Sequence, residues 1–124
     1  MDQYEITDFV KGTLGCKCPD GLFYDSSCEE PATAGPLFGA FSQADPRLPA
    51  VIRRAIHVSD RLLVAVTVTN RPYMLSDILR AGVKIRDAQG FNRFRLALEG
   101  VQLSDALVAQ LLAPFDDRVH LHQI

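Results

Sequence analysis

The sequence predicts a mixed α+β or α/β fold, in which four strands form one sheet with helices packed on it. Three observations indicate this class. Residues 51–58 and 61–69 are β-branched runs of period two separated by two residues, as in a β-hairpin. Two further strands follow, and a helical segment precedes each of them. Right-handed crossovers would then make the last three strands parallel, with the hairpin partner antiparallel beside the first.

The first element is a helix predicted over residues 2–14, where apolar residues recur at helical spacing. Gly15 follows at the position where a left-handed residue ends a helix. Residues 15–50 hold five of the seven prolines and show no sustained period. They predict a long irregular segment, which is typical of a functional or poorly ordered region. Its apolar side chains are expected to fasten part of it to the core: Leu37, Phe38 and Phe41.

The strand in residues 61–69 is apolar on both of its faces for part of its length, which predicts a central strand covered on both sides. A helix is predicted to begin near Leu75 and to run to Gln89, with Gly90 as its cap. In an alternative register, residues 83–98 form a second hairpin and this helix ends near Gly82.

Two strands and a helix complete the predicted fold. The run "FNRFRLAL" alternates apolar residues with arginines and is predicted to be a strand. Ser104 and Asp105 then carry the signals of a helix start, and Pro114 ends that helix. The final strand is "RVHLHQI". Its outer edge could pair with a second copy of the chain, because a sheet edge leaves backbone groups unpaired.

Length and composition predict one domain over residues 1–124, with residues 1–50 preceding a ββαβαβ core in residues 51–124. The net charge of −2 argues against a dedicated nucleic-acid-binding protein, which usually carries a basic excess. No apolar run reaches the length of a membrane span, and the acidic start lacks the pattern of a secretory signal. We therefore expect a soluble, cytoplasmic protein without a membrane partner.

The segment "GTLGCKCPDGLF" contains two cysteines one residue apart. If residues 19–24 begin a short helix, Cys18 lies at its N-cap, where the helix dipole stabilises a thiolate. Cys16 lies beyond the negative end of the first helix, and this raises a thiol pKa. One hypothesis is therefore a thiol-dependent redox protein, with Cys18 as the nucleophile and Cys16 as the resolving thiol.

A metal site is the second hypothesis for the cysteines, with zinc or an iron–sulfur cluster bound by Cys16, Cys18 and Cys28. Its further ligands would come from the three histidines, of which His120 and His122 share one strand face. The paired Cys-x-x-Cys knuckles of strong metal motifs are absent from the sequence. Structural thiols without a cofactor are the favoured interpretation, because buried free cysteine commonly acts as a small hydrophobe.

Arg93 and Arg95 share the polar face of a predicted strand and are candidates to bind an anion. A solvated face paired with acidic side chains is the favoured alternative at this net charge. The paired carboxylates Glu29-Glu30 and the pair at 116–117 are interpreted as solvating residues of loops. Other arginines are scattered nearby in the sequence: Arg53, Arg54, Arg61, Arg71, Arg80 and Arg86.

Two segments, "TLGCKCP" and "RDAQGFNRFRLAL", resemble those of small uncharacterised bacterial proteins that carry a Thr-Leu-Gly-Cys-x-Cys-Pro segment and a Gly-Phe-Asn-Arg-Phe-Arg-Leu strand. The resemblance implies no activity and no catalytic residue. It draws attention to Cys16, Cys18, Asn92, Arg93 and Arg95 without giving them a role. The sequence thus leaves two classes open: a small accessory or interaction protein with an unknown protein partner, and a thiol-dependent redox protein.

Overall fold

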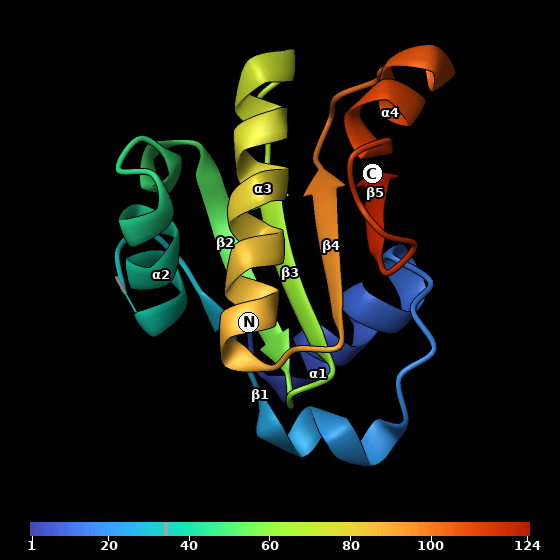
Figure 1. The fold of residues 1–124 in the computed structure, drawn as a ribbon. Helices are drawn as coiled ribbons and strands as arrows, with labels where there is room; N and C mark the ends of the chain where they lie inside the picture. Colours follow the sequence, from blue (N-terminus) through green and yellow to red (C-terminus); the bar gives the residue numbers. More distant parts are fainter. Residues whose placement is uncertain (34) are drawn as a thin grey trace.

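The computed structural model describes residues 1–33 and 35–124 and contains one mixed sheet of five strands in the order β1-β2-β3-β4-β5 (Figure 1). β2 (Ile52–Val58) and β3 (Leu62–Thr67) form the antiparallel hairpin. β4 (Arg93–Leu98) and β5 (Val119–Gln123) continue the sheet in parallel with β3. The predicted class and the direction of these four strands are confirmed. The predicted strand count is one too low.

The crossover helices also agree with the sequence. α3 (Pro72–Gln89) joins β3 to β4, and Gly90 ends it with a φ of 79°. Residues 83–89 are therefore helical, and the alternative second hairpin is excluded. α4 (Asp105–Leu112) joins β4 to β5, and the Ser104 side chain accepts a hydrogen bond from the Leu107 N–H at 3.2 Å. The hairpin turn has three residues rather than two, because Val58 pairs with Leu62 and Ser59 takes a positive φ of 50°.

The N-terminal helix begins as α1 (Gln3–Thr7) and widens into a π-helical stretch over Asp8–Thr13. Gly15 ends it with a φ of 70°, as the sequence predicts. The capping box at its start, in which Asp2 and Glu5 exchange hydrogen bonds, was not part of the sequence prediction.

Residues 15–50 are more regular than their composition predicts. They contain a 3₁₀ helix (Asp20–Asp25), the edge strand β1 (Ser26–Glu29), the helix α2 (Pro36–Ala44) and a second 3₁₀ turn (Leu48–Ala50). β1 pairs antiparallel with β2 and supplies the fifth strand. The prediction of a long irregular segment is wrong, because elements of four to nine residues are too short to show a sequence period.

A buried carboxylate from β1 holds the start of α2. The side chain of Glu29 accepts hydrogen bonds from the backbone N–H groups of Leu37, at 2.9 Å, and Phe38, at 3.0 Å. Gly35 makes room for this carboxylate, since a Cβ at that position would overlap it. The interpretation of Glu29 as a solvating loop residue is therefore wrong: it caps a helix from a strand, which no local pattern encodes.

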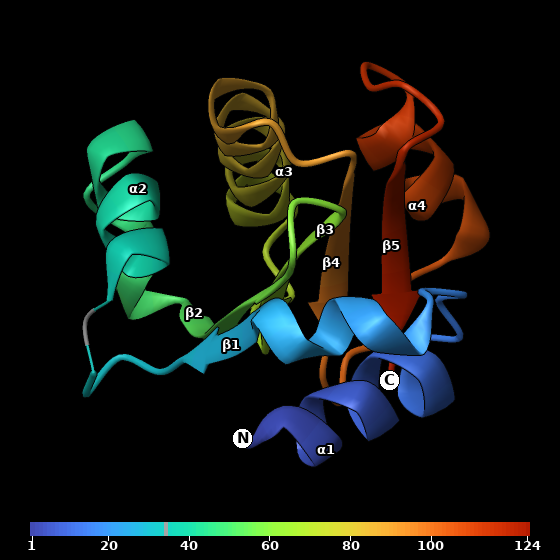
Figure 2. The ribbon, with the colours of Figure 1, turned by 90° about the horizontal axis from the view of Figure 1, so that it is seen from below.

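The sheet is covered on both faces (Figure 2). α2, α3 and α4 pack on one face, which we call the helical face, and the predicted anchors Leu37, Phe38 and Phe41 are buried there. The N-terminal segment covers the other face, which we call the N-terminal face, with buried side chains such as Ile6 and Phe23. β3 is buried at every position, with alternate side chains in the two cores, so the predicted central strand is confirmed.

None of the helices in residues 1–33 and 35–124 is both long enough and apolar enough to cross a membrane.

Candidate anion-binding site

A hollow of about 230 Å³ lies on the N-terminal face, where the segment after the first helix crosses the sheet. Its walls come from that segment, from the amino-terminal parts of β3 and β4, and from β5. We call it the arginine pocket. It brings together most of the side chains that the sequence singled out as candidates. Its lining residues are Leu14, Gly15, Cys16, Lys17, Cys18, Arg61, Leu62, Arg93, Arg95, His120 and His122.

The end of the N-terminal helix positions the two cysteines. Gly15 turns the chain, and the Cys16 N–H then donates to the Val10 carbonyl at 3.0 Å. The following 3₁₀ helix begins at Asp20, with Pro19 at its N-cap. Cys18 is therefore one residue too early to be the predicted N-cap, because proline itself occupies that position.

The period-two alternation of the strands places the basic side chains on the same face. Arg95 pairs across the sheet with Val64 on one side and with His120 on the other. His122 lies two residues further along β5, on the same face as His120. His57 pairs with Leu63, which belongs to the core of the helical face. The histidines thus separate, with two at the arginine pocket and His57 on the opposite side of the sheet.

Arg95 is a buried cation without a counter-charge among the described residues. Only 3% of it is exposed. Its Nη1 donates to the carbonyls of Phe94, at 3.2 Å, and Arg118, at 3.0 Å, whereas its Nε has no hydrogen-bond partner among the described residues. No carboxylate among the described residues forms an ion pair with Arg95. An unpaired buried charge costs several kcal/mol, so its setting is unusual for a structural residue.

The charges around Arg95 have the same sign. Lys17, Arg61 and Arg93 line the same hollow, and none of the described lining residues is acidic. Low-dielectric walls strengthen the field of such a cluster and concentrate anions in it. The favoured sequence interpretation, a solvated face paired with acidic side chains, does not describe this arrangement.

The two histidines of the pocket have pKa values below the usual value for histidine. Burial, followed by the positive charge of Arg95, lowers the pKa of His122 below its usual value. The same two causes lower the pKa of His120, although its hydrogen bond with the Asp117 carbonyl opposes them. The Nε2 atom of His122 is buried and has no hydrogen-bond partner in the described structure. An anion in the pocket would offset the second cause, the positive charge of Arg95.

The thiols differ in exposure, and they do not form the metal site considered above. Cys18 is 6% exposed and packs in the core of the N-terminal face, whereas Cys16 is half-buried. Cys28 lies on β1, which is three strand spacings, or roughly 14 Å, from the strand β4 that lines the arginine pocket. Within residues 1–33 and 35–124, no three His, Cys, Asp or Glu side chains are grouped to hold a metal ion. The zinc or iron–sulfur set of Cys16, Cys18 and Cys28 is therefore not assembled.

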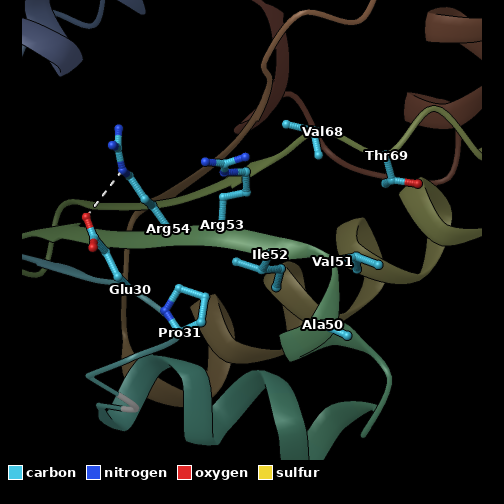
Figure 3. Close-up of a pocket in the computed structure, with 9 residues that line it drawn as sticks. All are labelled: Glu30, Pro31, Ala50, Val51, Ile52, Arg53, Arg54, Val68 and Thr69. Carbon is cyan, nitrogen blue, oxygen red and sulfur yellow. Dashed lines mark ion pairs between the residues drawn. The ribbon is translucent and has the colours of Figure 1, made fainter.

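A second hollow, of about 470 Å³, lies beside β2, toward the edge of the sheet that is opposite β5 (Figure 3). Its charges are mixed, because Arg54 forms an ion pair with Glu30 at 3.6 Å. Arg53 is the other cation in its wall. The arginine pocket differs in holding cations without a carboxylate, and this difference makes it the stronger candidate.

Two lining residues were not chosen from the sequence. Lys17 carries no sequence signal beyond its place between the two cysteines, and Arg61 is one of the six arginines scattered in the sequence. The parallel register of β3 and β4, in which Leu62 pairs with Arg93, places Arg61 beside the basic strand face. The position of Arg61 directly before a central strand is visible in the sequence. It indicates a place beside Arg93 only when β3 and β4 are known to be neighbours.

Comparisons of the chain with protein-family models, with curated proteins and with solved structures found no match. The resemblance carried by "TLGCKCP" and "GFNRFRL" therefore stays a prediction, and the pocket itself supplies the evidence on function.

Proposed function

We propose that the protein is a small accessory protein that binds a small, multiply charged anion, of the phosphate or carboxylate class, in the arginine pocket. The observation that carries this proposal is the buried guanidinium of Arg95 without a carboxylate partner. A bound anion would supply the counter-charge that the described part of the chain does not.

The size and composition of the pocket favour a small ligand. A hollow of about 230 Å³ accommodates a phosphate or a short carboxylate, whereas a nucleic acid would need an extended basic surface. Guanidinium groups suit such ligands, because their planar donors match two oxygens of one anion. The exposed Arg93 and Lys17 are the groups that an entering anion meets first.

In this proposal Cys18 and Cys28 are structural thiols. Cys18 belongs to the core, and burial raises the pKa of the Cys28 thiol. The cytoplasm is part of the proposal, because an odd number of free thiols is typical of a reducing compartment. Pairing of two copies through the outer edge of β5 is compatible with it and predicts a mass that rises with concentration in light scattering.

A phosphate titration at constant ionic strength tests the proposal. We expect saturable shifts in the ring NMR signals of His120 and His122 and an unchanged signal for His57, which lies on the other face. Arg93→Gln should weaken phosphate binding roughly tenfold, which corresponds to the loss of one charged hydrogen bond. Arg93 is exposed, so this variant is expected to fold.

The matched control is Arg80→Gln, which removes the same charge from α3 on the helical face. Arg80 is exposed and paired with Asp77, so its loss should leave phosphate affinity unchanged. Equal weakening by the two variants would show nonspecific attraction to a basic protein and would contradict the pocket. A titration without histidine shifts would contradict it as well.

A further inference from the structure

We propose that Cys16 undergoes thiol–disulfide exchange with small anionic disulfides that the arginine pocket attracts. The inference rests on the proposed anion site and names a class of molecule that would use it. It differs from the sequence hypothesis, in which Cys18 was the nucleophile.

The accessibility of Cys16 is the first support. Its half-buried side chain borders the arginine pocket and also an adjoining hollow of about 540 Å³, lined by Lys11, Lys17 and Pro19 among others. A reagent can therefore approach the sulfur from an open side while its other end extends over the basic face. Cys18 lines both hollows as well, but at 6% exposure it is buried in the core of the N-terminal face and is less accessible than Cys16.

The second support is independent of the thiol. Arg95 is only 3% exposed, and it lines the pocket without a carboxylate partner among the described residues. Arg61 and Arg93 add to its charge. A disulfide that carries carboxylates would place its negative groups against these arginines, whereas a cationic disulfide of similar size would be repelled.

The exchange step balances without any further reactant. Cys16 loses its proton to solvent, and its thiolate attacks one sulfur of the small disulfide. The S–S bond of the reagent breaks as the new S–S bond to Cys16 forms. The departing half leaves as a thiolate and takes a proton from water. The electron pair of the broken S–S bond leaves with the departing sulfur, which is reduced as the Cys16 sulfur is oxidised, and the retained sulfur keeps its oxidation state.

Cys28 provides an internal control, because it is also half-buried but lies in a different field. Burial is the main cause that raises the pKa of its thiol above the usual value. The surrounding charges are mixed, since the N-terminus and Arg54 favour a thiolate and Glu30 and Glu29 oppose it. An anionic disulfide should therefore react at Cys16 in preference to Cys28, although neither thiol is fully exposed.

The experiment treats the reduced full-length chain with oxidised glutathione, which is anionic, or with cystamine, which is cationic, and follows intact mass with time. Peptide mapping then locates the addition. We expect glutathione to add at Cys16, on the order of ten times faster than cystamine at low salt, with the ratio falling as salt screens the pocket. Arg93→Gln should reduce the ratio, Cys28→Ser should not, and Cys16→Ser should abolish the addition.

Several results would overturn the inference: preferential addition at Cys28 or Cys18, equal rates for the two reagents, or a Cys16–Cys18 disulfide in place of the adduct. Phosphate binding by the wild-type chain separates the two proposals. If this chain binds phosphate but shows no preference for glutathione, the thiol inference fails and the anion site stands. If phosphate does not bind and the reagents react alike, both fail.

Discussion

Among the described residues, each face of the sheet buries one arginine, and the two arginines have partners of different charge. On the helical face, Arg86 of α3 is 2% exposed and donates to Asp116 through two hydrogen bonds of 3.0 and 2.7 Å. Its Nε donates to Asp87 at 3.0 Å. On the N-terminal face, Arg95 is 3% exposed, and its hydrogen bonds in the described structure go to backbone carbonyls. Burial is the same, and the partner differs.

This difference separates a structural charge from a charge suited to a ligand. Hydrogen bonds with Asp116 raise the pKa of Arg86, and those with Arg86 lower the pKa of Asp116, so each group stabilises the charged form of the other. The pair ties the end of α3 to the turn before β5. Arg95 is as buried as Arg86 but has no such ion pair among the described residues. We therefore expect substitutions on the two faces to have different effects on stability.

The largest expected effect lies on the helical face, at Gly82 in α3. A Cβ at this position would overlap the ring of Phe94, which is fully buried in β4. Gly82→Ala should therefore destabilise the protein by about 3 kcal/mol, even though alanine favours a helix by up to about 1 kcal/mol. Urea unfolding monitored by circular dichroism measures this change.

The matched control is Gly39→Ala in α2, where a Cβ would meet no atom within 4 Å. Here the helix preference acts alone, and we expect stabilisation of up to about 1 kcal/mol. Similar effects at the two glycines would show that the helical face is not closely packed around Phe94.

The next effect compares the two arginines directly. Arg86→Gln should lower the free energy of unfolding by about 2 kcal/mol, because it removes charged hydrogen bonds and leaves Asp116 without its main partner. Arg95→Gln should cost less in phosphate-free buffer, since no carboxylate is orphaned. A larger loss from Arg95→Gln would contradict the interpretation that its charge is unsatisfied.

Acid titration extends this comparison. The folded pKa of Asp116 is below 3.8, so its contribution to stability is present above pH 3.8 and disappears as the pH falls through the folded pKa. In Arg86→Gln this acid-dependent loss should shrink, whereas Arg95→Gln should retain it. Unfolding free energies measured between pH 5 and about 2 supply the test.

The smallest expected effect concerns the histidines of the arginine pocket. Their folded pKa values lie below 6.5, so the unfolded state binds more protons and stability falls as the pH drops below 6.5. A bound anion would raise these pKa values and reduce the loss. Low millimolar sulfate, which keeps its charge over this range, should therefore stabilise the protein more at pH 5.5 than at pH 7.5, by under about 1 kcal/mol.

The control for this measurement is His122→Gln, which removes the more buried of the two pocket histidines. In this variant the additional effect of sulfate at low pH should diminish, while the general effect of sulfate on protein stability remains. Sulfate stabilisation that does not change with pH would contradict protonation in the pocket.

Much of the fold follows from local signals. The helix end at Gly15, the cap at Ser104, the helix end at Gly90 and the hairpin around Ser59 were all readable in the sequence, because each involves neighbouring residues. Missing from the prediction were β1 and α2, which are too short to show a period. Their stability depends on pairing with β2 and on the distant carboxylate of Glu29.

The candidate site divides in the same way. Period-two alternation placed Arg93 with Arg95 and His120 with His122 on shared strand faces, but no local pattern showed that the cysteine segment crosses those strands. The expected setting of Cys18 is also not found, since Pro19 takes the N-cap position itself and Cys18 is buried.

By itself, the sequence determined the order of the core elements, the direction of four strands and the residue types available for chemistry. Backbone preferences and side-chain periodicity act over a few residues, and they suffice for that. Chain packing established that Arg86 contacts a carboxylate, that Arg95 contacts carbonyls, and that Cys16 and His122 line the same pocket. The residues in the two arginine contacts are 30 and 23 positions apart in the sequence, and Cys16 and His122 are more than a hundred apart. Local backbone preferences do not act over such separations, so only the packing of the chain brings these residues together.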